Sequence, residues 1–94
     1  MEFEFDPRKS ERNEELHGVS LDWAQSLWDQ NHLIIPAKSV AGEAREMILA
    51  RVEREFYVAV FTMRKGAIRL ISCHRADARL ERLYEDEVRR RKAH

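Results

Sequence analysis

A strand that runs directly into a helix sets the strongest constraint on how this chain folds. The stretch Ala67–Tyr84, AIRLISCHRADARLERLY, begins with β-forming residues and continues with apolar residues at helical spacing. Upstream, Phe56–Thr62 is rich in β-branched and aromatic residues, and Arg64-Lys65-Gly66 provides a turn. Together these segments predict an antiparallel hairpin followed by a C-terminal helix.

The length of the hairpin turn decides which side chains share a face of the sheet. A two-residue turn would pair Thr62 with Arg69. The same register, carried along both strands, puts Arg69 and Arg75 on one face and His74 on the other. A three-residue loop would shift every one of these pairings.

The N-terminal third predicts a short strand and two helices. Met1–Phe5 alternates apolar and acidic residues, as a strand with two different faces does. A helix over Pro7–His17 begins at an Asp-Pro pair and ends before Gly18. The capping residue Ser20 predicts a second helix over Leu21–Trp28.

The middle of the chain supports two interpretations. Leu33–Ile35 predicts a short strand that ends at Pro36, followed by a loop over Ala37–Gly42. The composition of Glu43–Glu55 favours a helix. Its apolar residues also alternate as they would in a strand, so both structures stay open for this segment.

Length and composition indicate one small domain. Ninety-four residues suffice for one modest core, so we expect a single domain over residues 1–94. The longest apolar run, Phe56–Phe61, is too short to cross a bilayer, and the polar N-terminus does not resemble a signal peptide. The single cysteine, Cys73, fits a reducing compartment. We therefore expect a cytoplasmic protein with no membrane partner.

Charge is distributed unevenly, although the formal net charge is zero. Residues 1–31 carry three basic and eight acidic residues, a net −5, whereas residues 62–94 carry ten basic and five acidic residues, a net +5. The basic part can bind a phosphate backbone or an acidic protein. Acid–base pairs in the last helix, such as Glu85 with Arg89, account for much of its charge without any partner.

Metal and phosphate-loop chemistry have no support in the sequence. The four histidines are far apart, neither H-x-x-x-H nor C-x-x-C occurs, and the three glycines form no phosphate loop. We therefore expect neither a metal nor a cofactor. Cys73 lies in the middle of a predicted strand, where a small buried side chain is more common than a nucleophile.

Metal-free cleavage of RNA is the reaction that the remaining polar residues fit. It needs a base for the 2′-hydroxyl proton, an acid for the leaving 5′-oxygen and cations for the charged transition state. The same residues also have structural explanations, as helix cap, turn or core, and the predicted strand and helix can exist without any site. The candidate catalytic residues are His17, Arg64, Arg69, Arg75 and Tyr84, and the candidate RNA-binding residues are Lys9, Lys65, His74, Arg79 and Arg82.

The order of these residues resembles that in one family. The segment Phe3-Glu4-Phe5-Asp6-Pro7, then Lys9, Asn13 and His17-Gly18-Val19-Ser20, resembles the N-terminal signature of the BrnT toxins. The resemblance continues in order through Glu43, Arg45, Val58–Thr62, Arg64, Ile68–Ser72, Arg75, Ala76 and Tyr84.

The resemblance implies an α+β fold like that of the RelE ribonucleases. The expected architecture is a small antiparallel sheet of about four strands, with two N-terminal helices and a C-terminal helix. It also implies a strand around Arg45–Val52, against the helix that composition favours. The implied activity is that of an endoribonuclease toxin of a type II toxin–antitoxin system, which inhibits translation. A BrnA-like ribbon–helix–helix antitoxin would neutralise the toxin, and operator DNA would be contacted only through the complex.

Three positions depart from the family pattern. Leu16 replaces a usual lysine, and Leu80 replaces a usual glutamate four residues before Tyr84. The run Ser72-Cys73-His74-Arg75 stands where the family usually has Ser-Ala-Arg followed by Arg or Lys, so His74 replaces a usual arginine. These departures support a second hypothesis. The chain would then be a weakly active or inactive toxin homologue that binds the antitoxin and takes part in autoregulation of the operon.

Overall fold

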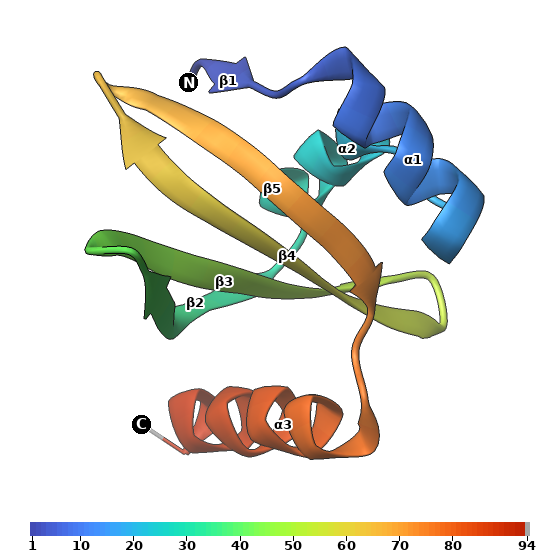
Figure 1. Ribbon diagram of the computed structural model, residues 1–94. Helices are drawn as coiled ribbons and strands as arrows, with labels where there is room; N and C mark the ends of the chain where they lie inside the picture. Colours follow the sequence, from blue (N-terminus) through green and yellow to red (C-terminus); the bar gives the residue numbers. More distant parts are fainter. Residues whose placement is uncertain (94) are drawn as a thin grey trace.

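A single mixed β-sheet forms the centre of the molecule (Figure 1). The computed structural model describes residues 1–93. The five strands lie in the order β1-β5-β4-β3-β2, with β1 parallel to β5 and every other neighbouring pair antiparallel. The strands are β1 (Phe3–Glu4), β2 (His32–Val40), β3 (Glu43–Val52), β4 (Glu55–Arg64) and β5 (Ala67–Arg75).

Helices cover both faces of this sheet. Three N-terminal helical segments lie on one side and the C-terminal helix lies on the other (Figure 1). They are α1 (Pro7–His17), α2 (Leu21–Ala24), the 3₁₀ helix η1 (Gln25–Asp29) and α3 (Ala78–Lys92). The predicted α+β class is therefore confirmed.

The predicted helix boundaries depend on caps that the structure contains. The side chains of Asp6, Ser20 and Asp77 each accept a hydrogen bond from a backbone N–H in the first turn of the following helix. Gly18 ends α1 with a φ of 81°, in the left-handed region that glycine adopts without strain. The predicted start and end of α1 are confirmed.

The number and direction of the strands differ from the prediction. The sheet has five strands rather than about four, and it is mixed because β1 runs parallel to β5. The second N-terminal helix is shorter than predicted, since α-helix gives way to a 3₁₀ helix after Ala24. The tighter 3₁₀ geometry carries Leu27 into the core and Trp28 against Phe61.

Strands β2 and β3 correct two predictions from local sequence. The predicted strand end at Pro36 and the loop after it are wrong, because β2 continues to Val40. Proline is tolerated there because β2 is an edge strand, where a missing N–H need not break a ladder. The helix that composition favours over the next segment is also wrong. β3 is a strand, as the family resemblance implies, with both of its faces covered by core residues.

The β4–β5 hairpin has the predicted two-residue turn and an unpredicted bulge. Thr62 pairs with Arg69 and Phe61 with Leu70, but Val60 pairs with Ser72. The residue between Leu70 and Ser72, Ile71, is therefore the extra residue of a β-bulge.

The bulge reverses the predicted distribution of side chains over the two faces. Beyond it, His74 pairs with Val58 and Arg75 pairs with Tyr57. Val58 packs under α3, whereas Tyr57 packs on the side of α2. Arg69 and His74 therefore share the α3 face, and Arg75 lies on the opposite face. The predicted grouping of Arg69 with Arg75 is wrong.

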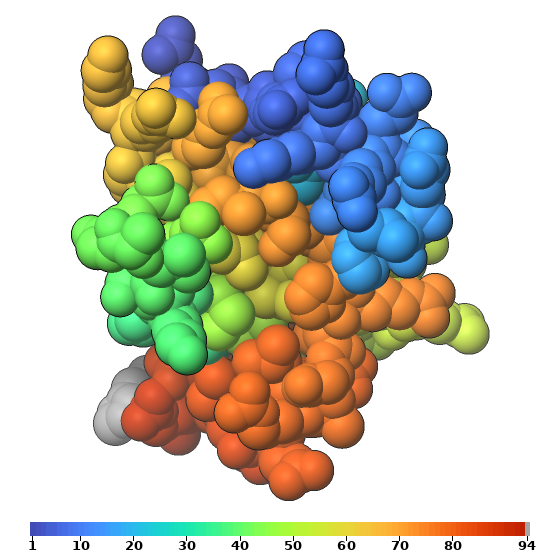
Figure 2. All heavy atoms as spheres, viewed as in Figure 1, coloured from blue at the N-terminus to red at the C-terminus, as the bar shows by residue number. Residues whose placement is uncertain are grey.

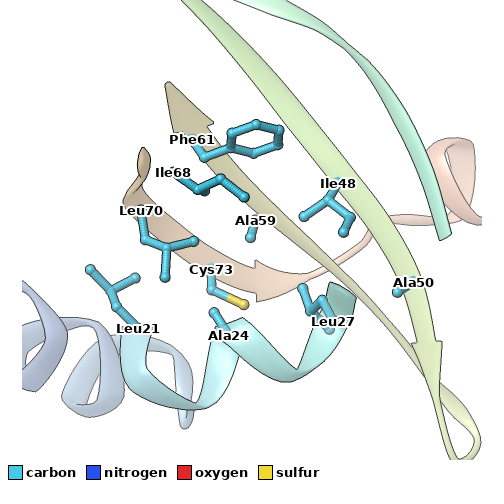
Figure 3. Packing of buried hydrophobic residues seen from close by; sticks show 10 residues of the cluster. All are labelled: Leu21, Ala24, Leu27, Ile48, Ala50, Ala59, Phe61, Ile68, Leu70 and Cys73. Carbon is cyan, nitrogen blue, oxygen red and sulfur yellow. The ribbon is translucent and has the colours of Figure 1, made fainter. Parts of the chain in front are cut away.

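Two hydrophobic clusters fill the space on either side of the sheet. The larger lies under α2 and η1, which contribute the fully buried Leu21, Ala24 and Leu27 (Figure 3). Trp28 meets Phe3 and Phe61 edge to face, with ring centroids 5.0 and 5.1 Å apart. The smaller cluster joins α3 to the sheet through Leu49, Val58, Leu80 and Tyr84.

Candidate active site

The side chain of Asn13 joins α1 to the edge of β5. Its Nδ2 donates to the carbonyl oxygens of Val19 and Cys73, both at 2.7 Å, and its Oδ1 accepts from the Cys73 N–H at 3.1 Å. Since β1 pairs with β5 only at Ile68 and Arg69, the edge at Cys73 has no strand beside it. The buried amide of Asn13 takes the place of that strand and satisfies both backbone groups of Cys73.

This bridge brings two histidines together. His17 lies four residues after Asn13, one helical turn along the same face of α1. His74 directly follows Cys73 in β5. The two imidazole rings lie with their centroids 5.5 Å apart and their planes inclined at 46°. Two proton-exchanging groups from opposite ends of the sequence therefore meet where α1 and β5 end.

One nitrogen of His74 has a fixed role. Its Nδ1 lies 2.8 Å from the carbonyl oxygen of Arg75. A carbonyl can only accept a hydrogen bond, so Nδ1 carries a proton and donates it. Nε2 is then the nitrogen of His74 that stays available for acid–base chemistry.

Arg69 and Arg75 each lie beside one carboxylate. Arg69 Nη1 is 3.9 Å from Glu4 Oε1, and Arg75 Nη1 is 3.6 Å from Glu55 Oε2. Both pairs are at least partly exposed to solvent, and exposed ion pairs typically contribute ~0–1 kcal/mol. A phosphate group can therefore replace either carboxylate at little cost.

Within residues 1–93, some arginines of α3 are paired with carboxylates and others are not. Arg89, Arg90 and Arg91 pair with Asp86 or Glu87 on the same helix. The hydrogen bond from Arg90 lowers the pKa of the Glu87 carboxyl below its ordinary value. Within the described residues, no carboxylate lies within ion-pair distance of the exposed Arg79 and Arg82.

Other predicted site residues lie away from the two histidines. Arg64 pairs with Ala67 at the turn end of the hairpin, whereas His74 is at the opposite end of β5, and Lys65 is in the turn itself. Lys9 lies on the exposed surface of the first half of α1. The structure therefore does not bring these three cations together with the imidazole pair.

Tyr84 is held in the smaller hydrophobic cluster. Its hydroxyl donates to the carbonyl oxygen of Asn31 at 3.0 Å, and its ring meets Phe56 edge to face with centroids 5.3 Å apart. Leu80 is buried in the same cluster. Tyr84 and Leu80 therefore pack α3 against the sheet.

Part of the sheet stays open to solvent between the helices and the β2–β3 hairpin (Figure 2). In Figure 2, strands β4 and β5 (yellow and light orange) are visible between α1 (blue), the β2–β3 hairpin (green) and α3 (red). Arg69 and His74 belong to the α3 face of β5, which has this opening. The sheet can therefore be reached from solvent here without displacement of a helix (Figure 2).

Cys73 is a core residue, as its position in the strand predicts. The side chain is fully buried, with its sulfur directed toward Ala24 (Figure 3). Burial raises the pKa of the thiol to about 12. The nucleophilic thiolate is therefore disfavoured at neutral pH.

Sequence reasoning missed the structural role of Asn13 and the carboxylates of Glu4 and Glu55. A signal for Asn13 was present, since asparagine is a poor helix former and this one lies inside a helix. Nothing local in the sequence indicates which arginine each glutamate meets, because these pairs depend on strand order.

No metal site emerges from residues 1–93, where no three His, Cys, Asp or Glu side chains are arranged to hold an ion. His94, one of the four histidines, lies outside the described residues. In the same part of the chain no helix is both long enough and apolar enough to cross a membrane.

Comparison with known protein families identifies a match over most of the chain. A family model described as the ribonuclease toxin BrnT of a type II toxin–antitoxin system matches residues 5–79. The matched part runs from before α1 to the start of α3, so it includes both histidines and the Asn13 bridge. No curated protein matches the chain.

Proposed function

The chain belongs to the family of BrnT ribonuclease toxins of type II toxin–antitoxin systems, and we propose that it cleaves RNA without a divalent metal where α1 meets β5. The contact between the imidazoles of His17 and His74, 5.5 Å between ring centroids, carries this proposal. Two imidazoles at this distance can act on the two ends of one phosphodiester.

Cleavage requires two proton transfers, one from the RNA to the protein and one from the protein to the RNA. One imidazole accepts the proton of the RNA 2′-hydroxyl, and the resulting oxygen attacks the adjacent phosphorus. As the new P–O2′ bond forms, the P–O5′ bond breaks, and the other imidazole donates a proton to the departing 5′-oxygen. The products are a 2′,3′-cyclic phosphate and a free 5′-hydroxyl, so no external oxidant, reductant or metal is needed.

Arginines stabilise the charge that develops on the phosphate. Arg69 shares the face of His74, five residues nearer the hairpin turn, and Arg75 directly follows His74 but lies on the opposite face of β5. Both side chains can exchange a surface carboxylate for a phosphate oxygen, and a guanidinium suits that geometry. Flanking RNA would contact Lys9, Arg64, Lys65, Arg79 and Arg82, all exposed. The predicted catalytic role of Tyr84 gains no support from its buried position.

A type II toxin has a protein antitoxin as its partner. We propose that this antitoxin is BrnA-like, with a ribbon–helix–helix part through which the complex binds operator DNA. We also propose that the toxin acts in the cytoplasm to inhibit translation, and that the sheet and helices are arranged as in RelE-like ribonucleases.

A second candidate function is that of a weakly active or inactive homologue that binds the antitoxin and takes part in autoregulation. Leu16 favours it, because this leucine precedes His17 and is 65% exposed, where an apolar side chain offers nothing to RNA. Leu80 favours it as well, since it replaces a usual acid with a core residue.

The deciding test is cleavage of a labelled single-stranded RNA in EDTA. We expect the wild-type protein to cleave it, and we expect His74→Gln and Arg69→Ala each to lose ~100-fold or more in rate. His32→Gln is a matched control, because the Nδ1 of His32 also lies 2.8 Å from a carbonyl oxygen, that of Gln30, and this histidine is in the edge strand β2. It should retain full rate.

The outcomes separate the two functions. If both site variants cleave RNA at the wild-type rate, the proposed active site is wrong. A folded wild-type protein that cleaves no RNA would favour the antitoxin-binding homologue instead. Circular dichroism of each variant shows whether the fold is retained.

A further inference from the structure

A groove lies between the β2–β3 pair and the first half of α3. It has a volume of about 440 Å³ and an apolar floor with charged side chains at its rim. The floor is formed by Ile35, Pro36, Met47, Leu80 and Leu83, and the rim by Arg79, Arg82 and Asp86.

The charges at the rim are unequal. Asp86 is paired with Arg89 of the same helix, at 3.5 Å. Arg79 and Arg82 have no such carboxylate within the described part of the chain. The groove therefore presents two uncompensated positive charges beside an apolar surface.

We propose that this groove binds an acidic amphipathic segment of the antitoxin. The proposal rests on the family assignment, which provides an antitoxin, and it adds the surface and the chemistry of the contact. Apolar side chains of the segment would cover the floor, and its carboxylates would pair with Arg79 and Arg82. Leu80 and Leu83 lie three residues apart, so the apolar row along α3 matches that of a partner helix.

The chemistry of the floor favours a protein segment over RNA. Bound single-stranded bases typically stack on aromatic rings, and the floor is aliphatic. Leu83 is 43% exposed, so a bound partner segment can cover part of its apolar surface. An acidic segment with apolar residues can cover the apolar floor and pair with the arginines of the rim, whereas RNA can pair only with the arginines.

Occupation of the groove would also affect RNA binding. Ile35 pairs with Met47, Met47 with Val60, and Val60 with Ser72, so one row of residues crosses the α3 face from the groove to β5. A segment bound in the groove takes Arg79 and Arg82 away from RNA and can extend along this row toward His74. Antitoxin and RNA would then exclude one another.

The test compares two exposed leucines. Leu83→Asp places a carboxylate in the groove, while Leu16→Asp places one on the exposed surface of α1. The probe is the purified antitoxin encoded beside the toxin gene, and its affinity for each full-length variant is measured by calorimetry. We expect Leu83→Asp to weaken binding ~10-fold or more and Leu16→Asp to leave it unchanged.

A second variant tests the charge at the rim. Arg82→Glu should weaken antitoxin binding and reduce its dependence on salt, because one ion pair is lost. Circular dichroism and thermal denaturation establish that each variant is folded.

The results that overturn the proposal are distinct from those that overturn RNA cleavage. If Leu83→Asp binds the antitoxin with wild-type affinity, or if the wild-type protein does not bind it at all, the groove is not the docking site. Loss of RNA binding in Leu83→Asp with full antitoxin affinity assigns the groove to RNA instead. Calorimetry needs no RNA cleavage, so the docking site can be established even for an inactive toxin.

Discussion

Cys73 and His74 are neighbours in β5 with opposite surroundings. The cysteine is fully buried in the larger cluster, whereas the histidine lies beside His17 at the surface end of the strand. Alternation along the strand separates them, and the bulge at Ile71 decides which of them points inward. A single extra residue therefore turns Cys73 toward α2 and η1 and His74 toward the opposite face of the sheet.

Burial of the Cys73 thiol predicts a loss of stability at high pH. Its pKa rises from an ordinary value of 9.0 to about 12 on folding. The folded state therefore holds the proton more tightly, and this stabilisation is fully present below pH 9.0 and is lost as the pH rises toward 12. Urea denaturation at pH 7 and pH 10.5 should show a lower free energy of unfolding at the higher pH.

Cys73→Ala is the control for this effect. It removes the thiol, so its free energy of unfolding should change less between the two pH values than that of the wild-type protein. An equal change in both proteins would assign the pH dependence to other groups.

A side chain, rather than a strand, connects α1 to the sheet. Asn13 makes three hydrogen bonds to the backbone of Val19 and Cys73. Asn13→Ala leaves three backbone groups without a partner, and each unsatisfied buried group costs ~1–3 kcal/mol. Because water can enter part of the space, we expect a loss of about 3 kcal/mol in the free energy of unfolding.

Asn31→Ala serves as the comparison in the same denaturation experiment. Its side chain is exposed, and the carbonyl that accepts from Tyr84 remains after the substitution. It should change the stability by less than ~0.5 kcal/mol. A small effect at both positions would show that Asn13 is not the link between α1 and β5.

Local sequence predicts those elements whose limits depend on neighbouring residues. The caps at Asp6 and Ser20 are local and are confirmed, and of the two turn lengths left open the structure has the two-residue turn. The bulge at Ile71 is not local, because it depends on how β5 fits against β4 and the helices at once. For this reason the predicted register holds up to Leu70 and fails after it.

The candidate site also depends on contacts that local sequence does not predict. His17 and His74 can each be chosen from the sequence as proton-exchanging residues, but their contact depends on the path of α1 along β5. The β3 segment has the composition of a helix and becomes a strand because two layers of helices enclose it. Tertiary context overrides propensity at this position.

Charge is separated across the whole molecule. The acidic residues 1–31 form α1, α2 and η1, and the basic residues 62–94 include β5 and α3. A polyanion should therefore contact β5, the hairpin turn and α3 before it contacts the exposed side of α1. The zero net charge of the chain conceals this preference.

The double variant Arg64→Gln and Lys65→Gln tests this arrangement. If both residues contact phosphates, RNA affinity should fall, and the slope of log affinity against log salt should decrease by roughly 1 to 1.5. Glu11→Gln with Glu14→Gln, in the acidic part, should leave the slope unchanged. Filter binding at several salt concentrations gives both values, and equal slopes for the wild type and the basic-site variant would place RNA elsewhere.

The long separation between α1 and its partner strand affects when the toxin can become active during synthesis. Asn13 and Cys73 are 60 positions apart, and Phe3 pairs with Ile68. Contacts over such distances form slowly and require both segments to have been synthesised. A growing chain attached to the ribosome therefore carries His17 long before it has His74. The two imidazoles can meet only after β5 has been made, so the proposed active site cannot assemble on a nascent chain that ends before His74.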